Sequence, residues 1–194
     1  MDKKKIILAS KSPRRQILLE RLNLSFEIIP SQYNEPIKKF DKFSYTKIEN
    51  LAKNKALSIG PLIKNENTLI ISADTVVILN NKIFIKPINF MDAYLILKSL
   101  SAKTHKVVTS VCLYDYLTKK ILTFSDTTYV TFKYLTDNTI KKYILKKRPY
   151  DKAGAYGIQE LDKSLIKKIN GSFDNIIGLP SEKLKTVLYK NFNL

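Results

Sequence analysis

Two of the four arginines in this chain are adjacent, at Arg14 and Arg15, where they could bind an anion. Ser12 and Pro13 favour a helix that begins there, because serine is a good N-cap and proline loses nothing at the first helical position. A helix N-terminus carries partial positive charge and unpaired N–H donors, so two more cations are unfavourable there unless an anion is bound. A guanidinium also matches phosphate oxygens in a planar fork. We interpret this turn as a phosphate-binding site, with solvated surface charge as the alternative.

Asp74 is the second candidate, because it interrupts an apolar run over 69–79. A buried carboxylate needs a hydrogen-bonded cap, a basic partner or a metal ion, and a structural cap alone could explain one aspartate. Lys86 follows a strand that returns toward Asp74, Lys55 lies in an apolar helical segment, and Glu35 lies in a loop. Together these residues suit a divalent metal and a polyphosphate, because hard oxygens hold the metal and cations hold phosphate.

Two residue types that often carry catalysis are interpreted here as structural. His105 is the single histidine, and no Gly-x-Ser-x-Gly elbow accompanies it, so a Ser–His–acid triad is disfavoured. The chain also lacks the Gly-x-x-x-x-Gly-Lys-[Ser/Thr] phosphate loop. Cys112 is the single cysteine, which excludes an intramolecular disulfide and a zinc-type cysteine cluster. We expect it to be a small core residue in a protein of the reducing cytoplasm.

The elements that must position these side chains alternate between strand and helix before they turn to hairpins. We predict strands at 5–9 and 24–29, a helix at 13–22, a helix at 44–57, paired strands at 69–79 and 83–85, a helix at 90–99, paired strands at 106–114 and 120–133, and helices at 137–147 and 182–191. Asn80 and Asn81 favour a type I′ hairpin turn. Four of the five glycines lie between Gly154 and Gly178, which predicts tight turns. This order predicts one α/β domain over 1–194 with a mixed sheet.

The composition is that of a soluble globular protein, with 44% hydrophobic and 26% charged residues in 194. No apolar run approaches the roughly 18 residues of a membrane span, and the N-terminal segment does not resemble a signal peptide. The net charge of +17 invites a nucleic-acid hypothesis. The lysines, however, are spread along the whole chain, so we expect weak, salt-sensitive attraction to polyanions rather than specific nucleic-acid recognition.

Several motifs, in order from about residue 6 to 181, resemble the Maf family of nucleoside triphosphate pyrophosphatases. They are Leu8-Ala9-Ser10-x-Ser12-Pro13-Arg14-Arg15, Leu51-Ala52-x-x-Lys55-Ala56, Ser72-Ala73-Asp74-Thr75-Val76-Val77, Lys86-Pro87, Thr104-His105-x-Val107, Asp151-Lys152-Ala153-Gly154-Ala155-Tyr156-Gly157-Ile158-Gln159, Asn170-Gly171-Ser172-Phe173 and Gly178-Leu179-Pro180. Each motif alone is weak. The ordered set is specific and spans nearly the whole chain.

The resemblance implies cleavage of a nucleoside triphosphate between its α and β phosphates, which releases a monophosphate and pyrophosphate. It implies a divalent metal, Mg²⁺ or Mn²⁺, and a twisted mixed sheet with flanking helices and two lobes around a cleft, as in inosine triphosphatases. By the family pattern Asp74 is the general base, and Glu35 with Asp74 lies near the metal. The family pattern also implies substrate contacts from Ser10, Arg14, Arg15, Lys55, Thr75, Lys86, Lys152 and Gln159. Homodimers are usual among such proteins, so we expect one here.

Three positions separate the branches of this family. The branch that acts on dTTP and UTP has the residue types found here at Arg14, Thr75 and Gln159, and the amide of Gln159 can both donate to and accept from a pyrimidine edge. We therefore predict dTTP and UTP as substrates. The alternatives are 7-methyl-GTP or another modified nucleotide and, from a different class, a basic nucleic-acid-binding or division-inhibiting protein. The chain departs from the family at 147–149, at Ile85 and at Glu160.

Overall fold

The fold is built on one mixed, twisted β-sheet with helices against both faces. The computed structural model describes residues 4–34, 36–192 and 194. Within them the sheet has seven strands in the order β2-β1-β3-β5-β6-β7, and β4 pairs with β3 as a branch. The strands are β1 (Lys5–Leu8), β2 (Phe26–Ile28), β3 (Thr68–Leu79), β4 (Lys82–Phe84), β5 (Thr104–Asp115), β6 (Ile121–Phe132) and β7 (Ile166–Asn170). β1 is parallel to β2 and β3, and the other pairings are antiparallel.

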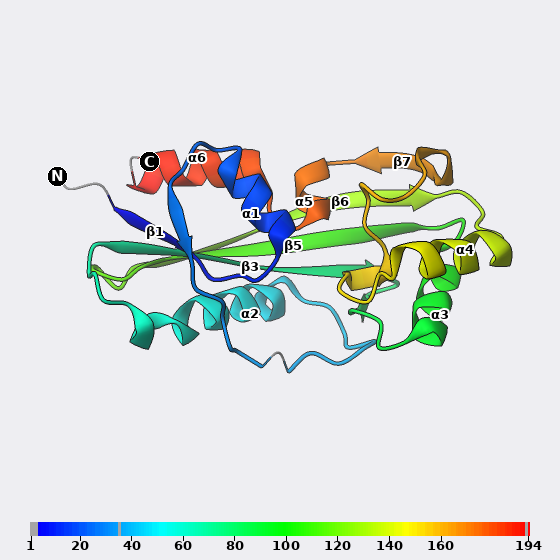
Figure 1. Cartoon of the computed structure of the whole chain (residues 1–194), viewed down its shortest axis with the longest axis horizontal. Coiled ribbons are helices and arrows are strands. Elements are labelled where there is room, and N and C mark those ends of the chain that lie inside the picture. The colour runs from blue at the N-terminus through cyan, green and yellow to red at the C-terminus, as the bar shows by residue number, and fades with distance from the viewer. Residues whose placement is uncertain (1–3, 35, 193) are drawn as a thin grey trace.

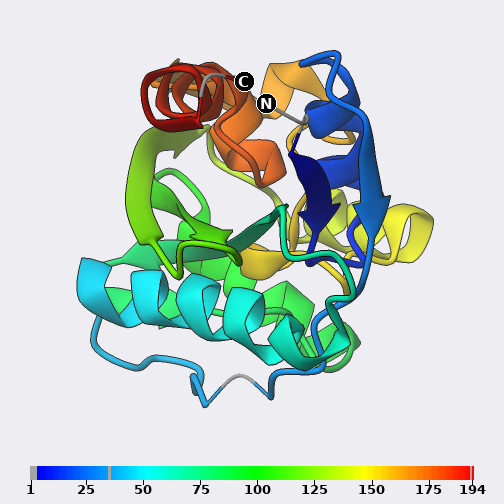
Figure 2. The ribbon, with the colours of Figure 1, turned by 90° about the vertical axis from the view of Figure 1, so that its left-hand side faces the viewer.

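The helices divide between the two faces of this sheet (Figures 1 and 2). They are α1 (Pro13–Glu20), α2 (Tyr45–Ser58), α3 (Phe90–Leu100), α4 (Asp137–Lys147), α5 (Phe173–Ile177) and α6 (Ser181–Phe192). In both views α2 lies on one side of the long strands, and α1, α5 and α6 lie on the other. None of the helices in the described part of the chain is long and apolar enough to cross a membrane.

The long strand β3 organises the core, because successive side chains point to opposite faces. Its even-numbered residues, including Ile70 and Val76, pack with α2. Its odd-numbered residues pack in two separate clusters. Leu69, Ile71 and Ala73 join the cluster under α1 and α6.

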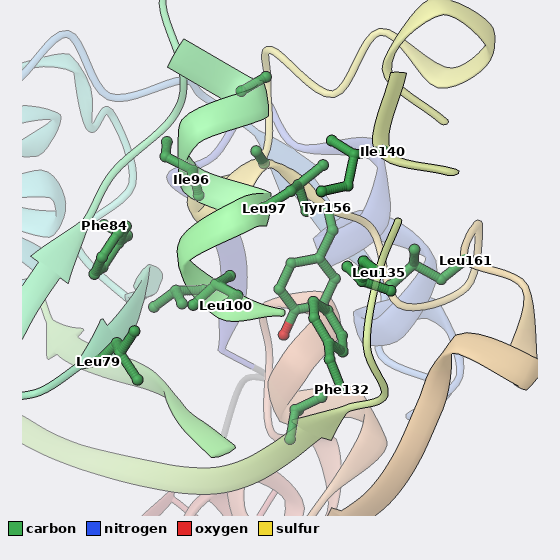
Figure 3. Close-up of a cluster of buried hydrophobic side chains, with 14 of the residues drawn as sticks. Leu79, Phe84, Ile96, Leu97, Leu100, Phe132, Leu135, Ile140, Tyr156 and Leu161 are labelled. Carbon is green, nitrogen blue, oxygen red and sulfur yellow. The ribbon is translucent and has the colours of Figure 1, made fainter. Parts of the chain in front are cut away.

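The second of these clusters begins two positions beyond Thr75. Val77 and Leu79 join α3 and α4 there, around Phe132 and Tyr156 (Figure 3). Along β3, Thr75 lies between these two clusters.

Most element boundaries agree with the sequence-based expectation. Ser44, Asn89 and Thr136 accept hydrogen bonds from the backbone N–H groups of Lys47, Asp92 and Thr139, which are each three residues further on, as N-caps do. Asn80 and Asn81 both have positive φ, as a type I′ turn requires. The helix expected over 13–22 ends earlier, at Glu20.

The segment 154–178, for which the sequence predicts tight turns and no further element, also contains a strand and a helix. β7 pairs with the edge of β6, and α5 follows it. A register shift between Thr131 and Phe132 places one extra residue in β7. Ile166 and Ile169 therefore both reach the core although they are three positions apart, which hides the alternation of a strand.

Candidate active site

The site lies where the edge of β3 loses its neighbours. β1 pairs with β3 as far as Ile71, and β4 pairs with it from Val77 onward. Between these points both faces of β3 border a cavity of about 560 Å³. Its lining includes Asp74 and all of the predicted substrate-binding residues, namely Ser10, Arg14, Arg15, Lys55, Thr75, Lys86, Lys152 and Gln159. The fold thus brings together residues that are up to 149 positions apart in the sequence, from Ser10 to Gln159.

Asp74 projects from the α2 face of β3 and is only 5% exposed. Lys55, in the last turn of α2, is also buried, and its Nζ donates to Oδ1 of Asp74. A carboxylate taken out of water needs such a charged partner to stay ionised without a large penalty. Of the partners that the sequence left open for Asp74, the structure shows a basic one, Lys55, which approaches from α2 on the same face of the sheet.

Arg15 is held by three groups at the start of α1. Its Nε donates to the carbonyl oxygen of Gly178 at 2.8 Å, and its Nη1 and Nη2 donate to the hydroxyls of Ser10 and Thr75 at 3.3 and 3.1 Å. The guanidinium thereby joins the turn after β1, the centre of β3 and the turn before α6. Its fork is fixed in the wall of the cavity before any ligand is bound.

The capping residue of this helix differs from expectation. Ser12 occupies the N-cap position and Pro13 the first helical position, but the Ser12 side chain makes no capping hydrogen bond. Instead its backbone N–H donates to Oγ of Ser10 at 3.2 Å. Ser10 therefore organises the turn that Ser12 was predicted to cap.

Arg14 lies at the mouth of the cavity in a chain of alternating charges. It donates to Asp151 at 2.6 Å, and Lys152 lies 2.8 Å from the other oxygen of Asp151 and 3.3 Å from Glu160. Burial alone would raise the pKa of Asp151, but hydrogen bonds from Lys152 and Arg14 outweigh it and lower the pKa to about 2. Asp151 was not singled out from the sequence, although it directly precedes Lys152.

Part of the cavity lining is apolar. Val77, Val107, Tyr156 and Ile177 line it, and Gln159 lies exposed beside them. The hydroxyl of Tyr156 is 2.7 Å from Nε2 of His105, which is fully buried behind it. Burial lowers the pKa of His105 to about 3, so this ring is neutral at physiological pH. Its place in the core is consistent with the structural role expected for it.

Cys112 is also a core residue as expected, since it is buried under α2. Burial raises the pKa of its thiol to about 12, which leaves almost no thiolate at neutral pH.

A divalent cation in this cavity would be bound partly by protein carboxylate oxygens and partly by oxygens of the ligand. No group of three or more metal-ligating side chains occurs among residues 4–34, 36–192 and 194. Mg²⁺ commonly binds through one or two carboxylates together with phosphate oxygens and water, so Asp74 in a cation-lined cavity fits such an ion bound with a phosphate. The predicted second ligand, Glu35, lies outside the described residues. Tyr33 and Ile37, on either side of it in the sequence, line the cavity.

Comparisons with known proteins cover almost the whole chain. A family model described as "Maf-like protein" matches residues 5–191. The chain is 44% identical over 185 residues to the dTTP/UTP pyrophosphatase of Thermosipho africanus, which covers 95% of this chain and 92% of that protein. It is 40% identical over 190 residues to a protein of the same name from Clostridium perfringens, with 98% of each covered.

A solved structure shares the fold. The Ham1 protein of Staphylococcus aureus matches with a TM-score of 0.56 at 12% identity, over 96% of this chain and 99% of that one. At this identity the likeness concerns the fold alone, and it agrees with the predicted mixed sheet with flanking helices.

Proposed function

Because the chain belongs to the family of Maf-like proteins, we propose that it is a pyrophosphatase that hydrolyses dTTP and UTP to the monophosphate and pyrophosphate. The observation that carries this proposal is that one cavity holds the buried carboxylate of Asp74 together with the cations of Arg14, Arg15, Lys55 and Lys86. A triphosphate needs cations along its length, and hydrolysis needs a base beside the phosphorus that water attacks.

In this mechanism Asp74 is the general base. It accepts a proton from the attacking water, the water oxygen bonds to the α-phosphorus, and the bond from that phosphorus to the bridging oxygen breaks. The electron pair of this bond leaves with pyrophosphate. Lys55, which donates to Oδ1, holds the carboxylate in place for the transfer. A divalent cation bound by Asp74, with Glu35 proposed as its second ligand, would polarise the water and neutralise phosphate charge.

The cations divide the work of holding the phosphates. Arg15 is already fixed by Ser10, Thr75 and Gly178, so it offers its charge without loss of side-chain freedom. Arg14 and Lys152 are paired with Asp151. A bound triphosphate would replace the Asp151 carboxylate as the anionic partner of these two cations. Charge develops on the leaving pyrophosphate in the transition state, so Lys86 is expected to affect kcat more than nucleotide binding.

We further propose that the enzyme works in the cytoplasm as a homodimer. A buried, protonated Cys112 suits a reducing compartment, and dimers are usual in the family the chain resembles. Light scattering coupled to gel filtration measures the assembly directly.

The proposal is tested by a nucleotide panel with product identification. With Mg²⁺ or Mn²⁺, dTTP and UTP are expected to give pyrophosphate and the monophosphate, faster than CTP, GTP or 7-methyl-GTP do. Asp74→Asn is expected to lower kcat by about 10²- to 10⁴-fold, the usual contribution of a general base.

Asp115→Asn is the matched control. Asp115 is equally buried and pairs with Lys4 at 3.0 Å, but it does not line the cavity. It should keep its turnover. Release of orthophosphate, preference for 7-methyl-GTP, or full activity in Asp74→Asn would each contradict the proposal.

A further inference from the structure

The cavity has two chemically different sides because β3 presents both of its faces to it. Asp74 and its partner Lys55 lie on the α2 side. Thr75 lies on the opposite side, where Val77 and Val107 supply an apolar wall.

An aromatic base needs apolar contacts on its faces and a few polar groups at its edge. The α2 side also has apolar lining, from Tyr33, Ile37 and Val76, but it is the side of Asp74, where the reacting phosphate must lie. If the substrate is a pyrimidine nucleotide, as proposed above, its base therefore belongs on the Thr75 side.

The direction of the hydrogen bonds around Thr75 can be worked out from the atoms involved. Thr75 and Thr109 are directly opposite each other in the β3–β5 ladder, and their hydroxyl oxygens are 3.0 Å apart. Thr109 also lies 2.8 Å from the backbone carbonyl oxygen of Asn175, which can only accept. Thr109 therefore donates its one hydroxyl hydrogen to that carbonyl oxygen. It can take only the acceptor role toward Thr75.

It follows that Thr75 donates its own hydrogen to Thr109. Arg15 then donates through Nη2 to the same Thr75 oxygen at 3.1 Å, because a guanidinium has no acceptor. The resulting chain runs in one direction, from Arg15 through Thr75 and Thr109 to the carbonyl of Asn175. Thr75 has no hydrogen left to offer a ligand, and its oxygen can accept one more hydrogen bond.

We propose that Thr109 is a positioning residue for substrate selection, because it makes Thr75 an acceptor only. The ligand group that fits such an acceptor is the imide N–H of uracil or thymine. Cytosine presents a bare nitrogen at that position, which would face the Thr75 oxygen lone pair to lone pair. This inference rests on the proposed function and adds a reason for selection between pyrimidines.

The same buried network supplies a matched control at Thr128, in β6. Its hydroxyl is also fully buried, donates to the carbonyl of Ser172 at 2.9 Å and accepts from Asn175 at 3.0 Å. Thr128 does not line the cavity, and its hydroxyl pairs with Ser172 and Asn175 rather than with Thr75. Loss of either hydroxyl removes buried hydrogen bonds, so both variants are expected to lose stability. Only loss of the Thr109 hydroxyl changes what Thr75 presents to the substrate.

The experiment compares kcat/KM for UTP and CTP, which differ only in the base, in wild type and three variants. In Thr109→Val the UTP-to-CTP ratio is expected to fall about tenfold, mainly through KM for UTP, because Thr75 can then turn its hydrogen toward the base. Thr109→Ser keeps the hydroxyl and should keep the ratio. Thr128→Val should keep the ratio as well, although urea unfolding shows it to be destabilised. Thr109→Ala, which avoids a new methyl group, replaces Thr109→Val if the latter does not fold.

An unchanged ratio in folded Thr109→Val or Thr109→Ala would overturn the inference, as would an equal fall in Thr128→Val. Failure of the proposed function has a different signature, namely no pyrophosphate from UTP in wild type. In that case the same comparison is made on calorimetric binding of UTP and CTP, and wild type that binds both equally would overturn the inference too.

Discussion

Burial keeps the imidazole of His105 neutral far below the pH at which an exposed histidine is protonated. Its pKa is lowered to about 3 inside the core, whereas the unfolded chain has an ordinary value near 6.5. Between these two values the unfolded state binds a proton that the folded state does not. The free energy of unfolding therefore falls as the pH drops from about 6.5 toward 3.

We predict that the free energy of unfolding falls between pH 7 and pH 4.5 in wild type, with a slope approaching about 1.4 kcal/mol per pH unit for this one proton. Urea unfolding followed by circular dichroism at several pH values measures it. His105→Gln, whose amide can still pair with Tyr156, should flatten the slope. Asp151 does not confuse the result, because its pKa moves from an ordinary 3.8 to about 2, below this window. A slope that is equal in wild type and variant would contradict the prediction.

At this scale the sequence predicts which residue types carry the chemistry, and it does not predict how they are paired. Asp74 and the paired arginines are conspicuous as types, and the structure places both in one cavity. The pairing of Arg14 with Asp151 joins residues 137 positions apart, and such a contact depends on the whole topology. Ser12 was predicted to cap its helix because its type is right, but Ser10 takes the local hydrogen bond instead.

At the scale of elements, the turn at Ala153–Ala155 sets the position of one part of the cavity wall. Gly154 has a φ of 70°, and a Cβ atom there would lie 2.6 Å from Cγ2 of Val77. This glycine is the point at which the turn packs directly on β3. The residues that follow it, Tyr156 and Gln159, line the cavity.

We predict that Gly154→Ala lowers the free energy of unfolding by about 2 kcal/mol or more. The cost of overpacking against Val77 adds to the cost of an alanine in the left-handed backbone region. It should also raise KM for UTP by displacing Tyr156 and Gln159. Gly60→Ala is the control, since its Cβ would meet Tyr116 at an ordinary 3.7 Å and no positive φ is involved. Urea unfolding and steady-state kinetics measure both variants. Equal stability of the two variants would show that Val77 yields at no cost.

Elements that are marked in the sequence by capping or turn residues and by a clear apolar period agree with expectation. The two elements without a clear apolar period, β7 and α5, were not predicted. Helix caps at Ser44, Asn89 and Thr136 and the Asn80-Asn81 turn are decided by a few neighbouring residues. β7 is a lysine-rich edge strand with a bulge, so its apolar residues lose the two-residue period. α5 has only five residues, too few to show helical periodicity.

At the scale of the whole molecule, the net charge of +17 acts on any polyphosphate that approaches. The lysines are distributed over the chain, so the field is broad and is screened within about 8 Å at physiological salt. Such a field speeds the encounter with an anion without selecting a sequence or a base.

We predict that kcat/KM for UTP falls several-fold between about 0.05 and 0.3 M KCl, while kcat at saturating UTP changes little. The reason is that screening weakens long-range attraction but leaves the desolvated contacts inside the cavity nearly intact. Initial-rate measurements over a salt series check this. The same series by fluorescence anisotropy should show RNA and DNA released at physiological salt. Tight nucleic-acid binding that persists there in Asp74→Asn would favour the alternative of a nucleic-acid-binding protein.

The use of both faces of β3 around one cavity has a consequence for how such a protein can diverge. Under the proposed function, neighbouring residues on this strand serve different tasks, so a change at an odd-numbered position can alter which base is accepted while Asp74 on the other face is retained. New substrate preferences can therefore arise by single replacements in a strand whose backbone is paired with β5 along this whole stretch. A scaffold built in this way can acquire a new substrate preference while it keeps the same hydrolytic reaction.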